Sequence, residues 1–145
     1  MTREDFEAYL DAFNRPDFDR LAGFFTEDAV FAHLPHLPRL VGRAAILDFY
    51  RSVKSRVHER VTPLALFIDA HGIAAEVSTE FTAFRDYPDF PSTPLAPGDV
   101  YRMTGIVFYT TRGARFSHIR GVARLTASVI RADGSTRIIA GPGAG

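Results

Sequence analysis

The stretch DVYRMTGIVFYTT at residues 99–111 carries the strongest structural signal in this sequence. Side chains alternate between the two faces of a β-strand, so Val100 and Phe108 would share one face, and Tyr101 and Tyr109 the other. Both faces are apolar or aromatic, which is typical of a strand in a sheet that is covered on both sides. We expect helices on one side and a second subunit, in a homodimer, on the outer face of the sheet.

The same period of two extends along the chain on both sides of this stretch. Turn signals separate the strands, with His71-Gly72 and Arg112-Gly113 as the hairpin turns. The predicted strands cover residues 61–70, 72–85, 99–111 and 114–126.

Nearer the N-terminus, apolar residues recur at the spacing of helices. Thr2 and Asp5 resemble a capping box at the start of the first helix. Pro16 can open a short second helix, and Gly42 lies at the start of a third. The predicted helices cover residues 3–14, 17–25 and 43–57, and a strand at residues 29–34 separates the last two.

Between the second and third of the later strands, proline recurs every third residue, which is the period of a polyproline II helix. The residues are Pro88, Pro91, Pro94 and Pro97. A stiff loop at the end of the sheet is the plainest interpretation, and a lid over a pocket or a docking motif are the alternatives.

Length and composition indicate a single domain. A chain of 145 residues that is 46% hydrophobic and 23% charged can bury a substantial core. Its 13 Phe residues must line a core, a pocket or a subunit contact. We assign residues 1–130 to one domain and residues 131–145 to a final short strand and a flexible C-terminal tail.

Charge and cysteine usage exclude several classes of function. The net charge is zero, with 17 basic and 17 acidic residues, which argues against binding to nucleic acid or to an anionic membrane. The absence of Cys excludes disulfides, thiolate metal sites and a Cys nucleophile. The charged start and the lack of a long apolar run predict neither a signal peptide nor a membrane span. We therefore expect a cytoplasmic protein.

Familiar catalytic motifs are missing: the sequence has no phosphate-binding glycine loop with Lys, no Gly-x-Ser-x-Gly and no His-Glu-x-x-His. His33 and His36 are close in sequence, but residues three apart in a strand point to opposite faces, and Pro35 intervenes. Alternation also argues against a catalytic pair of the neighbours Ser117 and His118. Neither a metal nor another cofactor is expected.

The order of helices and strands, together with five short motifs, resembles the nuclear transport factor 2-like superfamily. The motifs are Tyr9–Phe13, Phe18–Leu21, Phe25–Phe31, Gly42–Tyr50 and Arg112–Ile119. The resemblance implies an α+β, cone-shaped, cystatin-like fold, in which three N-terminal helices pack on a curved mixed sheet and enclose a pocket. Within the superfamily the chain is similar to the group of SnoaL-like polyketide cyclases and ketosteroid isomerase. Together the motifs are specific for the fold and hardly at all for the reaction.

The similarity to ketosteroid isomerase implies roles for individual residues. Tyr9 falls where that family has its oxyanion-binding Tyr, and His33 where it has its base Asp. Thr104 falls near the protonated Asp of the oxyanion hole, and His118 at an apolar position that lines the pocket. Because only the tyrosine is retained, the resemblance does not imply steroid isomerisation.

The last two long predicted strands lack the Asp that a resemblance to SnoaL-like cyclases would imply. SnoaL-like cyclases use a His and an Asp on these strands, yet residues 100–132 contain six Arg and no Asp or Glu. We hypothesise that Arg102 or Arg120, with His118, holds a carboxylate or stabilises an enolate, because Arg presents a planar fork of donors. Further substrate contacts are expected from Phe31, Phe49 and Val122.

Two functions stay open on the sequence. In the first, the chain is a cofactor-free enzyme for cyclisation or isomerisation: His33 abstracts a proton next to a carbonyl, and Tyr9 donates to the oxyanion with help from Thr104, His118 or Arg102. Hydration or epoxide opening is a close variant. In the second, the chain binds a ligand or another protein without catalysis, and His33 is a hydrogen-bonded histidine at a strand end. The ligand in either case is a small apolar or carbonyl-containing molecule, and an anionic one is compatible with the arginines.

Overall fold

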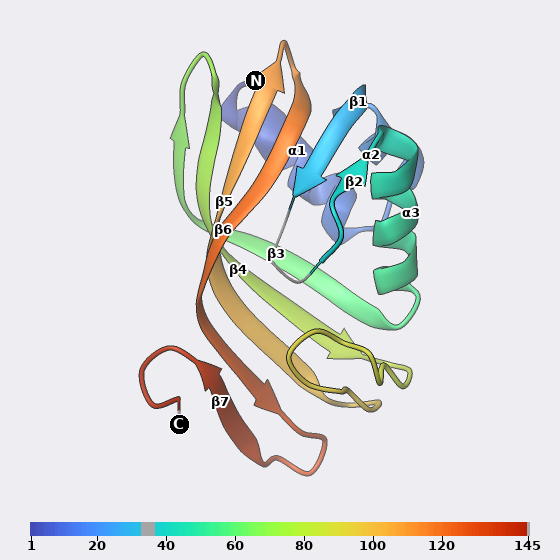
Figure 1. The fold of residues 1–145 in the computed structure, drawn as a ribbon, viewed down its shortest axis with the longest axis vertical. Helices are drawn as coiled ribbons and strands as arrows, with labels where there is room; N and C mark the ends of the chain where they lie inside the picture. The colour runs from blue at the N-terminus through green and yellow to red at the C-terminus, as the bar shows by residue number, and fades with distance from the viewer. Residues whose placement is uncertain (33–36, 145) are drawn as a thin grey trace.

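Three helices cover one face of a curved mixed sheet (Figure 1). This computed structural model describes residues 1–32 and 37–144, apart from the side chains of residues 122 and 123. The helices are α1 (Arg3–Asn14), α2 (Phe18–Ala22) and α3 (Arg43–Lys54). The strands are β1 (Phe25–Ala32), β2 (Leu40–Val41), β3 (Val57–Ile68), β4 (Gly72–Ala83), β5 (Val100–Arg112), β6 (Arg115–Ile130) and β7 (Thr136–Ala140). The α+β class and the superfamily fold expected from the sequence are confirmed.

The predicted capping box starts α1: the Thr2 hydroxyl accepts the Asp5 N–H at 3.1 Å, and the Asp5 carboxylate accepts the Thr2 N–H at 2.8 Å. The predicted second helix was too long. It ends at Ala22, because Phe25 pairs with β6 as the first residue of β1, and sheet pairing overrides the helical spacing of the aromatic residues. None of the described helices is long and apolar enough to cross a membrane.

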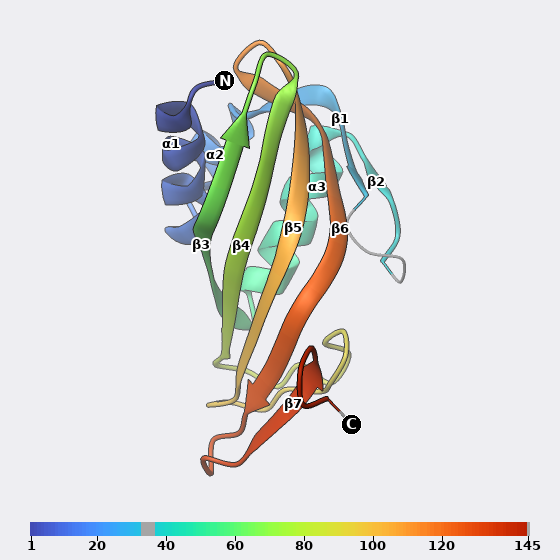
Figure 2. The ribbon, with the colours of Figure 1, turned by 90° about the vertical axis from the view of Figure 1, so that its left-hand side faces the viewer.

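The sheet has the strand order β2-β1-β6-β5-β4-β3, and β7 adds to β6 (Figure 2). The β1–β6 pair is parallel and the other pairs are antiparallel, so the sheet is mixed. At the β3–β4 turn, the Asp69 carboxylate accepts the N–H groups of His71 and Gly72. A Cβ on Gly72 would lie 2.0 Å from the Tyr109 carbonyl oxygen, so only glycine allows β4 to start here.

Two register shifts in the middle of β6 change which of its side chains face the helices. Val107 pairs with Gly121 but Ile106 with Ala123, and Gly105 pairs with Arg124 but Thr104 with Thr126. Each shift inserts one extra residue into β6, and each extra residue reverses the alternation of faces. The bend of β5 and β6 in Figure 1 lies in this region.

An aromatic core joins α1 to the sheet. Phe6 on α1 and Phe116 on β6 are fully buried, and the Tyr9 and Phe116 rings meet at 4.7 Å in an edge-to-face arrangement. Asn14 then fixes the end of α1 to β3, because its side-chain amide donates to the Val61 carbonyl at 2.9 Å and accepts the Val61 N–H at 2.8 Å. These contacts hold α1 beside β3, at one side of the concave face.

The proline-rich loop between β4 and β5 folds back onto the concave side of the sheet, beyond the end of α3 (Figure 1). Tyr87, Phe90 and Leu95 are buried in a second apolar cluster with residues of α3, β5 and β6. Backbone hydrogen bonds of 2.8 and 3.0 Å join Tyr87 and Leu95. The loop is therefore part of the packed structure and closes one end of the space under the helices.

Candidate functional site

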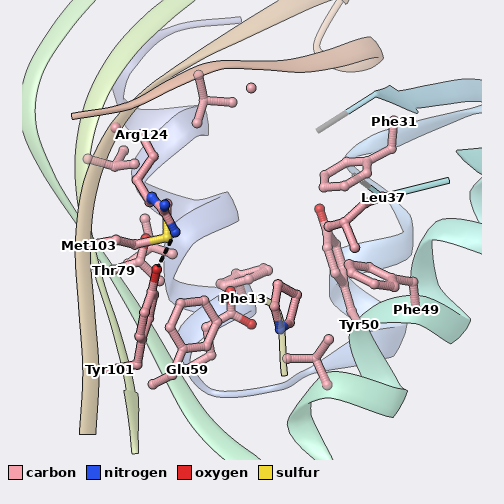
Figure 3. A pocket seen from close by; sticks show the side chains of 18 of the residues that line it. Phe13, Phe31, Leu37, Phe49, Tyr50, Glu59, Thr79, Tyr101, Met103 and Arg124 are labelled. Atoms are coloured by element: carbon pink, nitrogen blue, oxygen red, sulfur yellow. Dashed lines mark hydrogen bonds between the residues drawn. The ribbon is translucent and has the colours of Figure 1, made fainter. Parts of the chain in front are cut away.

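A cavity of about 350 Å³ lies between α1, α3, the concave face of the sheet and the proline-rich loop (Figure 3). Its walls are largely apolar and aromatic. Phe31 from β1, Leu37, and Phe49 from α3 form one wall, and Val77 and Met103 belong to the sheet. The predicted contact residues Phe31 and Phe49 therefore line the cavity, and polar groups enter it at a few places.

The first polar group is a set of three tyrosines, Tyr9 on α1, Tyr50 on α3 and Tyr109 on β5. All three line the cavity and are buried from solvent. Burial raises the pKa of each tyrosine well above its ordinary value, so the hydroxyls keep their protons at neutral pH. A protonated hydroxyl can donate a hydrogen bond to a ligand in the cavity.

The second polar group is a buried ion pair. Glu59 on β3 lines the cavity, and its carboxylate lies 3.8 Å from the ammonium of Lys54, the single lysine of the sequence. The side chains of Glu59 and Lys54 are only 13% and 5% exposed. The Lys54 ammonium also lies 3.7 Å from the centre of the Phe13 ring, a cation–π contact.

Burial shifts the pKa values of this pair in opposite directions. It raises the pKa of Glu59 above its ordinary value, and the nearby Lys54 charge offsets part of that rise. It lowers the pKa of Lys54, and the Glu59 charge offsets part of that fall. Glu59 is thus a stronger base than a solvated carboxylate and faces an apolar space.

The third polar group surrounds Arg124, which extends from β6 into the cavity (Figure 3). Its Nη1 donates to the Tyr101 hydroxyl at 2.8 Å and to the Ser92 hydroxyl. Ser92 belongs to the proline-rich loop and has a φ of 83°, a conformation that costs energy for any residue except glycine. Arg124 and Tyr101 therefore hold the loop at this end of the cavity.

A second ion pair lies at the outer rim. Arg56, just after α3, donates to the Asp89 carboxylate at 2.8 Å and stacks on the Tyr87 ring, with 4.0 Å from its guanidinium carbon to the ring centre. The Asp89 side chain is 73% exposed, so this pair faces solvent and joins the loop to the end of α3.

His118 lies on the other face of the sheet. It pairs with Thr110 and Val30, whereas the neighbouring Tyr109 and Ile119 line the cavity. Burial lowers the pKa of His118, and the charges of Arg120 and Arg39 lower it further. Among the described residues its Nε2 has no hydrogen-bond partner. Strand alternation thus separates His118 from Tyr9.

Three further predicted contacts, Thr104, Arg102 and Arg120, also belong to the outer face. The Thr104 hydroxyl lies 2.6 Å from that of Thr126. Arg102 donates to the Glu80 carboxylate at 2.7 Å, and the exposed Arg120 lies over the Phe108 ring. None of the three is among the residues found to line the cavity.

Two predicted site residues lie outside the part of the chain that the structure describes. His33, the predicted base, belongs to residues 33–36, and the side chain of Val122 is likewise not described. Of the predicted site, the structure therefore brings together Tyr9, Phe31 and Phe49.

Sequence reasoning missed Glu59 and Arg124. The strand that carries Glu59 was predicted to start at residue 61, but β3 starts at Val57. An earlier start would have placed Glu59 on the same face as Val57 and Val61. For Arg124 the sequence offers no such signal, because its inward position results from the register shift between Gly121 and Ala123.

Comparisons with known proteins agree with this fold. The family model for the SnoaL-like domain matches residues 6–119. No curated protein matches the sequence.

Among solved structures, a candidate polyketide cyclase from Xanthomonas campestris pv. campestris is 24% identical, with 81% of this chain and 86% of that chain covered and a TM-score of 0.70. Delta 5-3-ketosteroid isomerase from Mycobacterium sp. is 19% identical, with 93% and 95% covered and a TM-score of 0.65. An LEH-like epoxide hydrolase from M. tuberculosis is 17% identical, with 81% and 74% covered and a TM-score of 0.64. At these identities the similarity establishes the fold.

Proposed function

Because this chain belongs to the family of SnoaL-like domains, we propose that it is a cofactor-free enzyme that moves a proton next to a carbonyl group, in an isomerisation or a cyclisation. The observation that carries the proposal is a buried carboxylate, Glu59, in the same apolar cavity as three buried tyrosine hydroxyls. Base and hydrogen-bond donors are the two groups that enolate formation requires.

Glu59 acts as the general base in this proposal. Its carboxylate takes the proton from the carbon next to the substrate carbonyl, and the same proton is returned at another carbon in an isomerisation. Burial makes the carboxylate more basic, and the Lys54 ammonium at 3.8 Å offsets part of the rise in its pKa by favouring the ionised form. Lys54 is therefore a positioning residue that acts through Glu59.

The tyrosines stabilise the negative charge that develops on the carbonyl oxygen. Their side chains are buried and line a largely apolar cavity, so a hydrogen bond that they donate is stronger than in solution. Glu59 and the three tyrosines line the same cavity, which places base and donors around one space.

Proton exchange tests this proposal. Small ketones that raise the Tm of the protein are incubated with it in deuterated buffer, and NMR follows the loss of hydrogen next to the carbonyl. We expect loss faster than in buffer alone for at least one of them. Ketones that bind but exchange no faster than in buffer would contradict the enzyme and favour the alternative, a binding protein of the same fold.

Two further expectations concern the oligomeric state and the cellular location of the protein. A homodimer through the outer face of the sheet remains our proposal, and half-exposed Phe108 lies on that face. A cytoplasmic location remains a prediction from the absence of Cys.

A further inference from the structure

The charges around the cavity do not balance. In the described part of the chain, four charged side chains line it: Arg56, Glu59, Asp89 and Arg124. Arg56 pairs with Asp89 and Glu59 pairs with Lys54. Among the described residues, Arg124 forms an ion pair with no carboxylate. It is left as a positive charge in an apolar space.

The bonds of Arg124 to the protein do not neutralise it. Both go to neutral hydroxyls, those of Tyr101 and Ser92, and both are made by Nη1. A guanidinium has further N–H groups on Nε and Nη2, in the fork that suits the two oxygens of a carboxylate. Gly105, the strand partner of Arg124, also lines the cavity and places no side chain beside it.

We propose that Arg124 binds a carboxylate group of the molecule that occupies the cavity, so that the substrate is an apolar carboxylic acid that also carries a carbonyl group. Tyr101 and Ser92 hold the guanidinium in place for this contact. The inference deepens the proposed function, on which it rests for the carbonyl. The contact between Arg124 and a carboxylate does not depend on the proposed reaction, because it requires only that a ligand occupies the cavity.

Binding of octanoate and of octanol, measured by calorimetry at neutral pH, tests this contact. The two probes share an apolar chain short enough for the cavity and differ in charge. We expect wild-type protein to bind octanoate about tenfold more tightly than octanol, a typical value for one charge-assisted contact. Arg124→Gln removes this preference and leaves the affinity for octanol unchanged, and Arg124→Lys restores part of the preference.

Arg102→Gln is the matched control, because Arg102 lies on the outer face and pairs with Glu80. It should leave the preference for octanoate intact. Equal binding of the two probes by wild-type protein, or no binding of either, overturns the proposal. An equal loss of both affinities in Arg124→Gln also overturns it, because Arg124 would then only hold the loop.

The outcome is separable from that of the proton-exchange experiment. If octanoate is preferred through Arg124 but no ketone exchanges, the carboxylate contact stands and the enzymatic function falls. If ketones exchange but octanoate is not preferred, the enzymatic function stands and the carboxylate contact falls.

Discussion

Glu59→Gln is expected to lower the rate of proton exchange by about 10²–10⁴-fold, the usual contribution of a general base. The substitution keeps the size of the side chain, but an amide cannot accept the proton. Ligand binding should change much less, because the apolar walls and Arg124 are untouched. The rate is measured by NMR in deuterated buffer, and binding by calorimetry.

Glu80→Gln is the control for this variant, since Glu80 is half-exposed on the outer face and pairs with Arg102. In wild-type protein the rate should also fall as the pH drops through the raised pKa of Glu59, because the protonated carboxyl is no longer a base. An exchange rate that survives Glu59→Gln would remove Glu59 from the reaction.

Lys54→Met is expected to lower the free energy of unfolding by about 3 kcal/mol, because it leaves a buried carboxylate without its partner. The double variant Lys54→Met/Glu59→Gln should recover more than half of that loss, since it removes both charges. Urea unfolding measures both values, and Arg60→Met, at an exposed position of β3, is the control for the change of a cation to Met.

This loss should depend on pH. Without Lys54 the folded-state pKa of Glu59 rises further above its unfolded value. A carboxyl with a raised folded pKa stabilises the fold below its unfolded pKa, and that stability is lost as the pH rises through the folded pKa. The deficit of Lys54→Met should therefore grow as the pH rises above the unfolded pKa of glutamate, about 4.3. A deficit no larger than that of Arg60→Met would show that the pair is not effectively buried.

The fold could be predicted because its signals are local. The capping box of α1, the helical stripe that includes Tyr50 and the alternation around Tyr101 and Tyr109 depend on residues close in sequence. The predicted elements failed at their ends, at Phe25 and Val57, where sheet pairing decides whether helix or strand continues. That is a tertiary effect, which local spacing does not carry.

The site could be predicted only in part, because it depends on which face each strand presents. The alternation that places Tyr101 in the cavity already places Arg102 and Thr104 on the opposite face. Thr104 was predicted from the resemblance to ketosteroid isomerase, and Arg102 from the absence of carboxylates on these strands. Arg124 faces the cavity and Arg120 does not, because one extra residue is inserted in β6 between Gly121 and Ala123. An error of one residue in strand register exchanges a cavity residue for a surface residue.

The pH titration of Glu59, followed through its side-chain carboxyl carbon by NMR in carbon-13-labelled protein, tests most directly the claim that this carboxyl is a base in an apolar cavity. The signal is identified by its absence in Glu59→Gln. We expect a midpoint above the ordinary glutamate value of about 4.3, and a further rise in Lys54→Met. A midpoint at or below that value, unchanged in Lys54→Met, would show a solvated carboxylate and contradict the account.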